Sequence, residues 1–406
     1  MSGANGHTIG TPASHLGDDS TRTVPEGGSR APIPGPGPAG ARHLYVHLPF
    51  CAHRCGYCDF VTVTGHDGEH GGYVDALIAE LAFERHLLAD GVETVFVGGG
   101  TPTFTEPAAL ARLLAALPRA EETTVEANPE TVTPELAALL RKHGVSRVSL
   151  GAQSFQTHLL ETLERQARPD DVRGAVRTLR ETGFDNVSLD LIYGIPGQSV
   201  ADLERDLAEA IALGPEHVSA YELEAKPGTR FTHAHGQELE RQAEAMEDYF
   251  ERVVEQLTAA GYRWYETANF CRADESRDLR ARHNLGYWLG RDYLGIGVGA
   301  VSTAAGVRWR NAPSLPRYLA ALGCGERPER ELEELEPQTQ ARERLMLGLR
   351  LDEPLPLDGL DTALDRDALM RLQRHGLIAA TGETLELTRR GRFVGGGVTA
   401  ELLLES

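Results

Sequence analysis

The strongest signal in the chain is Leu44-Tyr-Val-His-Leu-Pro-Phe-Cys51-Ala-His-Arg-Cys55-Gly-Tyr-Cys58-Asp-Phe60. An apolar run typical of a short buried strand leads directly into a loop with three cysteines in the pattern CxxxCxxC. Three thiolates can hold three corners of a cubane iron–sulfur cluster, which normally takes four ligands. The next cysteine is Cys271, so one iron would keep an open position, as catalytic and substrate-binding metal sites do.

The spacing of these cysteines alone leaves two other interpretations open. Thiolate and imidazole ligands also suit zinc, so a structural zinc site with His47, His53 or His66 as fourth ligand is one alternative. Ordinary reduced thiols are the other. His53 and Arg54 lie between the first two cysteines, and their positive charge is expected to lower the thiol pKa values if the side chains stay close.

Composition narrows the class of protein. The 406 residues carry a formal net charge of −20, which argues against nucleic acid because phosphate binding needs a basic surface. Five cysteines, three of them clustered, do not form a disulfide framework. No apolar run approaches the roughly 20 residues that span a bilayer, and the N-terminus lacks a signal-peptide pattern. We expect a protein of the reducing cytoplasm without a transmembrane segment.

Beyond the cysteine loop, short apolar runs alternate with longer amphipathic ones. The strand-like runs are Leu44–Leu48, Thr94–Val97, Thr123–Ala127, Arg147–Gly151, Asn186–Ile192 and His217–Leu223. The helix-like runs between them are Tyr73–Leu88, Pro107–Ala116, Pro134–His143, Pro169–Thr182 and Val200–Leu213. This alternation predicts a parallel sheet with right-handed crossovers, and six units are too few for an eight-stranded barrel. The fold class we predict is α/β, a partial (β/α)6 TIM-like barrel.

The chain divides into four regions by composition. Residues 1–40 are rich in Gly and Pro and predict a disordered tail, and residues 41–265 predict the barrel. Residues 266–330 are the region that connects the barrel to the C-terminal domain. A long helix is expected before this region, over 237–260, and a charged linker at its end, over 325–337. Residues 331–406 predict a small α+β winged-helix-like domain. The acidity of the chain makes DNA binding a poor interpretation of that domain and favours a lid or a partner surface.

Polar or glycine-rich residues follow the predicted strands. Gly98-Gly-Gly-Thr101 ends the second, Glu126 the third and Asp190 lies in the fifth. Each alone is equally compatible with a turn or a helix-capping acid. Because the carboxyl ends of parallel strands meet at one edge of a barrel, their combination with the cysteine loop predicts a ligand site there.

CxxxCxYC after a short strand resembles the radical S-adenosylmethionine (SAM) superfamily, and the flanking Tyr-Val-His-Leu-Pro-Phe resembles its coproporphyrinogen dehydrogenase-related branch. The resemblance implies a 4Fe-4S cluster on Cys51, Cys55 and Cys58, with SAM on the open iron. It also implies SAM contacts from Tyr45, Tyr57, Gly99, Gly100, Thr101, Glu126, Gln153, Arg165 and Asp190.

A second motif, His283-Asn-Leu-Gly-Tyr-Trp288, places an imidazole beside two large aromatic side chains. Imidazole is a common haem ligand and aromatic rings suit a flat macrocycle, although a packed, hydrogen-bonded histidine is the more ordinary role. HNxxYW resembles the signature of the HemW-type haem chaperones, which implies haem binding near His283. Phe60 stands where coproporphyrinogen dehydrogenases carry a fourth cysteine. Val301 departs from the histidine that the family usually has.

The resemblance implies a haem chaperone that passes haem to acceptor proteins, with an electron donor for the cluster. The alternative is an oxygen-independent coproporphyrinogen III dehydrogenase, in which a 5′-deoxyadenosyl radical abstracts hydrogen from a propionate side chain. The shared scaffold favours that enzyme, whereas Phe60 and HNxxYW oppose it. A zinc-stabilised binding module is a third reading, but it leaves the pattern of strand ends unexplained.

Overall fold

Parallel strands form the centre of the fold, and a computed structural model describes them together with the rest of residues 40–225 and 230–404. The predicted tail, apart from Gly40, lies outside the described residues. Each of the six predicted strands is present. Their bounds are β1 His43–Leu48, β2 Val92–Gly99, β3 Ala120–Ala127, β4 Arg147–Gln153, β5 Val187–Tyr193 and β6 His217–Glu222.

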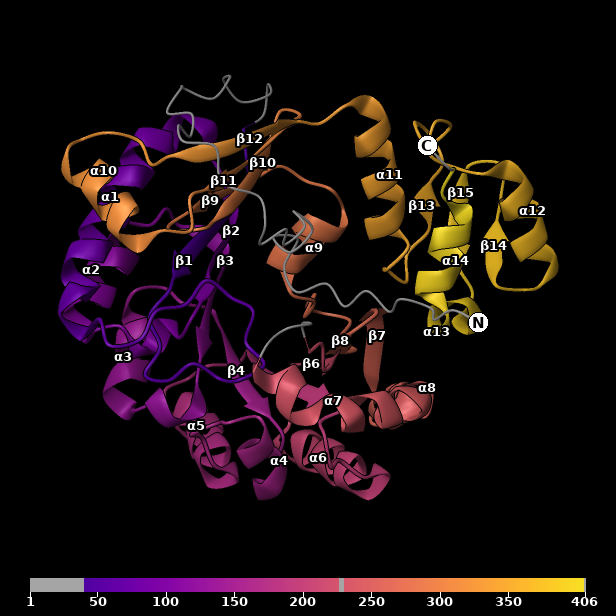
Figure 1. Ribbon diagram of the computed structural model, residues 1–406, viewed down its shortest axis with the longest axis horizontal. Coiled ribbons are helices and arrows are strands. Elements are labelled where there is room, and N and C mark those ends of the chain that lie inside the picture. Colours follow the sequence, from indigo (N-terminus) through magenta and orange to yellow (C-terminus); the bar gives the residue numbers. More distant parts are fainter. Residues whose placement is uncertain (1–39, 226–229, 405–406) are drawn as a thin grey trace.

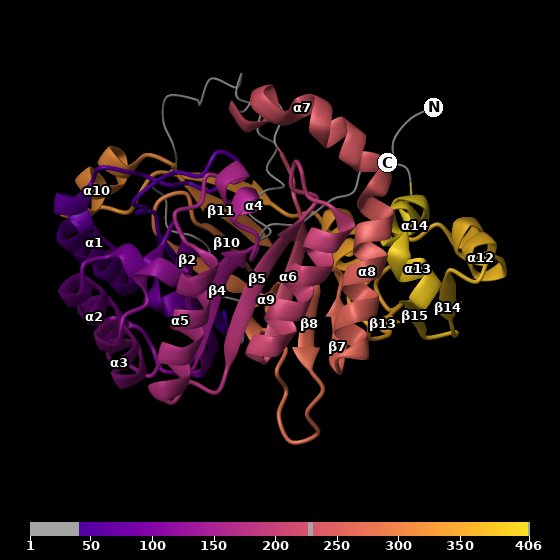
Figure 2. The same cartoon turned by 90° about the horizontal axis from the view of Figure 1, so that it is seen from below.

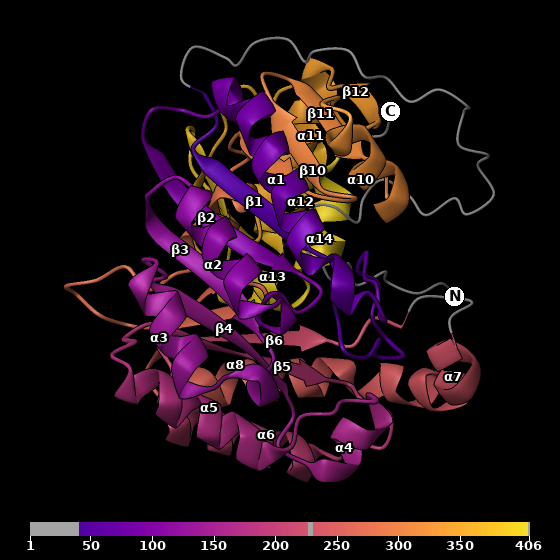
Figure 3. The same ribbon diagram turned by 90° about the vertical axis from the view of Figure 1, so that its left-hand side faces the viewer.

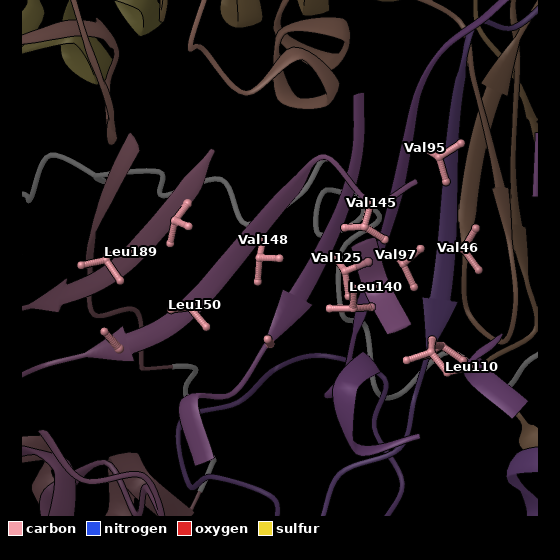
Figure 4. Packing of buried hydrophobic residues seen from close by; sticks show 14 of the residues in the cluster. Val46, Val95, Val97, Leu110, Val125, Leu140, Val145, Val148, Leu150 and Leu189 are labelled. Atoms are coloured by element: carbon pink, nitrogen blue, oxygen red, sulfur yellow. The ribbon is translucent and has the colours of Figure 1, made fainter. Parts of the chain in front are cut away.

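These strands are buried on both faces, as their apolar runs predict. On β1, Leu44, Val46 and Leu48 are fully buried in the main hydrophobic core under the helices. Figure 4 shows this layer, in which Val46, Val97, Val125 and Leu150 come from the four successive strands β1 to β4. The alternate residues of each strand, such as Tyr45, therefore face the inside of the curve, which frees that surface for polar side chains.

Helices cover the outer face of the curved sheet (Figure 1), as crossover connections require. The sequence predicts where they begin; Ser199, for example, caps α6 and forms a reciprocal capping box with Asp202. Their bounds are α1 His70–Glu84, α2 Pro107–Ala116, α3 Pro134–Lys142, α4 Thr157–Thr162, α5 Pro169–Glu181 and α6 Val200–Leu213. Short 3-10 turns occupy Asp67–Glu69, Arg85–Leu87, Pro102–Phe104, Pro129–Thr131 and Ala243–Ala245.

The sheet extends past the barrel on both sides, to twelve strands in the order β12-β11-β10-β9-β1-β2-β3-β4-β5-β6-β8-β7. The added strands are β7 Tyr262–Glu266, β8 Asn269–Arg272, β9 Tyr293–Ile296, β10 Val301–Ala304, β11 Val307–Asn311 and β12 Arg330–Glu334. The linker predicted over 325–337 is therefore wrong, because β12 pairs with β11 there. The expected boundaries at 265/266 and 330/331 likewise cut through β7 and β12.

The helix predicted over 237–260 is two helices, α7 Arg230–Gln242 and α8 Met246–Ala259, with a 3-10 turn between them. Figure 2 shows α7 at the end of the sheet where β6 finishes, and Figure 3 shows it projecting from the body of the molecule on that side. The short helix α9, Arg282–Trp288, lies within the curve of the sheet (Figure 1), and α10, Leu315–Gly323, packs beside α1.

The C-terminal residues have a hydrophobic core of their own, which includes Leu345, Leu360 and Leu385. Its elements are α11 Pro337–Gly348, β13 Leu355–Pro356, α12 Arg366–Arg374, β14 Ile378–Ala380, β15 Thr384–Leu387, α13 Arg389–Phe393 and α14 Gly395–Leu402. The helices and the three-stranded antiparallel sheet match the predicted α+β character. Among the described helices of the whole chain, none combines the length and apolarity that a bilayer crossing requires.

Candidate functional site

The cysteine loop leaves the carboxyl end of β1 and returns beside it. The Cys51 N–H donates to Val63 O at 3.0 Å, and the Val63 N–H donates back to Pro49 O at 2.8 Å. Within the loop, the Cys58 N–H donates to Cys55 O at 3.2 Å. These backbone bonds hold the base of the loop at the barrel rim, where the sequence places it.

Each of two thiols in the loop has a polar neighbour from another segment, Thr101 after β2 and Arg165 after α4. The Thr101 hydroxyl donates to Cys51 Sγ at 3.6 Å, and Arg165 Nη1 donates to Cys55 Sγ at 3.9 Å. Burial raises the pKa of Cys51 and raises that of Cys58 to about 11. The positive charge of Arg54 lowers both pKa values, as its place between the first two cysteines predicts, but burial has the larger effect.

Within residues 40–225 and 230–404, no three His, Cys, Asp or Glu side chains converge around one point, and this includes the three loop cysteines. The histidines that could complete a closed zinc site have other neighbours. Among the imidazoles considered as a fourth zinc ligand, His47 donates to Val61 O at 2.8 Å and His66 lies 2.9 Å from Glu69. His53 is exposed and lies 3.7 Å from Glu164.

Gly99 and Gly100, at the end of β2, allow other segments of the rim to pack closely against their backbone. A Cβ on Gly99 would lie 2.7 Å from the His47 ring, and one on Gly100 would lie 2.7 Å from the backbone of Pro49. Gly99 also has φ +116°, which favours glycine. Its N–H donates to Glu126 Oε2 at 3.1 Å, so the glycine segment and the acid are directly joined.

Asn128 connects two of the predicted SAM residues, Thr101 and Arg165, although sequence reasoning missed it. Its Nδ2 donates to Thr101 Oγ1 at 3.2 Å, and its Oδ1 accepts from Arg165 Nη2 at 2.8 Å. The same guanidinium donates to Gly151 O at 3.0 Å. The sequence Glu126-Ala-Asn128 contained the available signal, since a second polar residue stands at the same strand end.

Two carboxyl groups lie close together on the concave face. Burial, and then the charge of Asp190, raise the pKa of Glu126 to about 8. Burial also raises the pKa of Asp190, whose oxygens accept from the Ser149 hydroxyl at 3.1 and 3.2 Å. A positively charged ligand would offset this repulsion, so the pair fits the amino and sulfonium groups of SAM.

Gln153 and Tyr57 lie on opposite sides of this rim. Gln153 follows an irregularity in the pairing of β4 with β5 and has φ +63°, a region costly for a residue with a side chain. Tyr57 is half-buried, and its ring packs edge-on against Phe231 of α7 at 6.4 Å. Phe60, in contrast, is 48% exposed, so the position of the absent fourth cysteine faces solvent.

Tyr45 joins the barrel interior to the cysteine loop through His47, a residue that sequence reasoning treated only as a zinc ligand. His47 Nε2 must carry the proton it donates to Val61 O, so its Nδ1 accepts from the Tyr45 hydroxyl at 3.0 Å. Burial lowers the pKa of His47 to about 4, which keeps the ring neutral. This pair therefore holds the loop through a fixed tautomer.

The HNxxYW motif forms α9 and closes the amino-terminal end of the barrel. The Glu122 carboxylate of β3 accepts from the backbone N–H groups of Arg282 and His283 at 3.1 and 3.4 Å. His283 is 1% exposed, with Nδ1 2.7 Å from Thr94 Oγ1 and Nε2 2.9 Å from the Tyr287 hydroxyl. Both ring nitrogens are engaged, so ligation of haem iron by His283 requires one of these bonds to break.

The motif nevertheless lies next to the predicted SAM residues. The His283 ring stacks on Phe96 at 5.1 Å, and Phe96 stacks on Tyr45 at 6.2 Å. Tyr45 is therefore linked to α9 at the amino-terminal end of the barrel through Phe96, and to the cysteine loop at the rim through His47. Val301, at the position of the family's usual histidine, forms a small apolar cluster with Tyr287 and Tyr293.

Family models match two segments of the chain, one of which contains the cysteine loop. Residues 45–210 match the family model of the radical SAM superfamily, and residues 335–394 match the HemN C-terminal domain. In solved structures, the chain resembles the coproporphyrinogen III oxidase HemN from Escherichia coli, described as a radical SAM enzyme. That match has a TM-score of 0.74 and 23% identity, and it covers 89% of this chain and 90% of HemN. It shows the fold, a radical SAM barrel.

Curated relatives match the chain over most of its length. The protein named heme chaperone HemW in Mycobacterium tuberculosis (strain ATCC 25618 / H37Rv) is 38% identical over 92% of this chain and 96% of its own length. The protein of the same name in Bacillus subtilis (strain 168) is 32% identical over 90% of this chain and 100% of its own. The chain therefore belongs to the heme chaperone HemW family of radical SAM proteins.

Proposed function

We propose that this protein is a haem chaperone, which binds haem and transfers it to acceptor haemoproteins in the cytoplasm. The observation that carries the proposal is the stack from His283 through Phe96 to Tyr45, which links the HNxxYW motif at the amino-terminal end of the barrel to a residue that also contacts His47 beside the cysteine loop. The family relationship supports the same function, since relatives named heme chaperone match this chain over nearly their whole length.

In this proposal, Cys51, Cys55 and Cys58 hold a 4Fe-4S cluster that receives its electron from a separate donor. The rim residues that would hold SAM beside the cluster are Tyr45, Tyr57, Gly99, Gly100, Thr101, Glu126, Gln153, Arg165 and Asp190. The reduced cluster supplies one-electron chemistry towards bound SAM. The protein itself contributes the glycine backbone that permits close approach, the Glu126–Asp190 acid pair and the Arg165–Asn128 clamp beside Cys55.

We also propose that residues 331–406 work as a unit that supports α9. Arg350 forms a salt bridge of 2.6 Å with the fully buried Glu266, and its guanidinium lies 4.6 Å from the ring centroid of Trp288. The last residue of HNxxYW thus contacts the C-terminal unit directly.

The test is anaerobic reconstitution of the full chain followed by a haem titration read from the Soret band. SAM, a reductant and coproporphyrinogen are then added to the same preparation. Stoichiometric haem binding without protoporphyrinogen formation is the expected result. Turnover to protoporphyrinogen with weak or no haem binding would instead identify a decarboxylating enzyme. Ala in place of all three loop cysteines is expected to abolish the iron and sulfide content.

A further inference from the structure

Arg310 on β11 is a half-buried arginine without a partner in the part of the chain that the structure describes, since its guanidinium forms no hydrogen bond or ion pair there and its Nε is buried. Arg308, two residues earlier, is bonded to Glu343 at 2.9 Å and approaches Glu333 at 3.5 Å. A buried N–H group that lacks a hydrogen bond is costly, and Arg310 Nε is such a group. The contrast with Arg308 indicates that Arg310 is kept for a partner outside this chain.

The position of Arg310 is on the concave face of the sheet. Its neighbour Trp309 belongs to the main core on the opposite, helix-covered face. Arg310 pairs in register with Val301, which packs against Tyr287 of α9. The charge of Arg310 also contributes to the lowered pKa of His47, so the guanidinium lies near the residue that holds the cysteine loop.

The row of residues between Arg310 and Tyr45 carries no charged side chain, since Gly295 and Val301 stand between them. Tyr45 of β1 pairs with Gly295 of β9, which has no side chain. Gly295 N–H in turn donates to Ser302 of β10, next to the valine that pairs with Arg310. A ligand that lies across the concave face near Tyr45 would therefore meet the guanidinium at its far side without crossing another charged residue of this row.

We propose that Arg310 binds a carboxylate of the ligand held on this face, supplied either by a haem propionate or by the methionine part of SAM. A guanidinium group recognises a carboxylate through two parallel hydrogen bonds, and the pair gains strength when water is excluded. The formal net charge of −20 opposes the approach of an anionic ligand, and an unpaired cation at the site offsets that repulsion. The inference rests on the proposed function and gives it an anchoring residue.

The test compares ligands with and without the carboxylates. Haem and its dimethyl ester, whose propionates are uncharged, are titrated into the wild-type chain and into Arg310→Gln and Arg310→Lys, and SAM binding is measured in parallel. Arg317→Gln is the matched control, because Arg317 is an exposed arginine on α10 whose nearest acid, Glu329, is 3.5 Å away. Thermal unfolding checks that each variant is folded; no loss is expected for Arg310→Gln because no internal bond is removed.

If a propionate is the partner, Arg310→Gln should weaken haem binding by about tenfold to 100-fold and leave the dimethyl ester unchanged. If SAM is the source, the same loss should appear for SAM alone. In both cases Arg310→Lys restores part of the affinity. Equal affinities of wild type and Arg310→Gln for haem and SAM would overturn the inference while haem binding itself persists. A wild-type chain that binds no haem would instead defeat the proposed function.

Glu331 provides a second check, because it pairs in register with Arg310 on the edge strand β12 but is exposed and forms no bond to it within the described structure. Glu331→Gln is expected to change both affinities by less than about twofold. The two single variants and the double variant are also compared in stability. If both single variants lose stability and the double variant loses less than the sum of the two losses, the two residues pair with each other. That result would also overturn the inference.

Discussion

Glu126 is the residue from which we predict that the affinity for SAM depends on pH. Its pKa in the folded chain is raised from 4.5 to about 8, so near neutral pH it is largely protonated. A cationic ligand favours the carboxylate and lowers that pKa. Binding should therefore release a proton, and the apparent affinity for SAM should rise with pH up to about 8 and then level off.

Calorimetry in two buffers of different ionisation enthalpy measures this proton release. Glu126→Gln should remove the pH dependence and weaken SAM binding by at least about tenfold. The same raised pKa has a consequence for stability. The folded state keeps a proton that the unfolded state has lost between pH 4.5 and about 8, so this group's contribution to stability falls as pH rises through that window. An affinity independent of pH in the wild type would contradict the assignment.

His283 should affect stability whether or not it touches haem. His283→Ala removes the bonds to Thr94 and Tyr287 and leaves a cavity, so we expect a loss of about 2–4 kcal/mol in the free energy of unfolding. Tyr287→Phe removes a single bond and should cost about 1 kcal/mol. Denaturant titration measures both. An unchanged Soret band in a folded His283→Ala protein would exclude this residue as the haem ligand.

The cysteine loop, as an element, depends on the glycine turn before β10. Gly299 has φ +68°, and a Cβ there would lie 2.9 Å from Val61 Cγ2. Gly299→Ala should therefore displace the return segment of the loop and lower the iron content after reconstitution. Gly290→Ala is the matched control, because Gly290 has φ +64° but open space around it.

Both substitutions carry the backbone cost of a positive φ, about 1 kcal/mol. Only Gly299→Ala adds a collision with the cysteine loop. Iron per chain and the thermal midpoint Tm are measured together on both proteins. Equal iron contents in the two variants would show that Val61 does not transmit the disturbance to Cys51.

Elements also show what the sequence could and could not predict. The six parallel strands were predictable because burial on both faces produces continuous apolar runs such as Val187–Tyr193. β11 and β12 were not, since Val307–Asn311 and Arg330–Glu334 are short and mixed in polarity and pair only with each other and β10. The cysteine loop and the strand-end residues followed from spacing and resemblance. Asn128, His47 and the burial of His283 depend on packing between distant segments, which no local pattern records.

At the scale of the whole molecule, the C-terminal unit is fixed to the barrel through an arginine on an aromatic ring. The Arg392 guanidinium lies 3.6 Å from the ring centroid of Trp264 and donates to the backbone oxygen of the same residue at 2.8 Å. Burial lowers its pKa to about 10. Arg392→Ala should lower the free energy of unfolding by about 2 kcal/mol.

Arg389→Ala is the control for this contact, since Arg389 is exposed and lies 5.8 Å from the ring of Phe393. If the C-terminal unit is held mainly through Trp264, denaturation of Arg392→Ala should show earlier loss of the C-terminal residues, detected by limited proteolysis. A single unchanged transition in both variants would mean that Arg350 and its salt bridge suffice to hold the two parts together.

The positive φ of Gln153 implies a trade-off between stability and ligand binding in this chain. Its left-handed backbone costs on the order of 1 kcal/mol, which a glycine would not incur. Gln153→Gly should therefore raise Tm by a few degrees while weakening SAM binding. Selection for thermal stability alone would replace this glutamine with glycine. The glutamine is therefore expected to be kept for its predicted contact with SAM, at the cost of a less stable backbone.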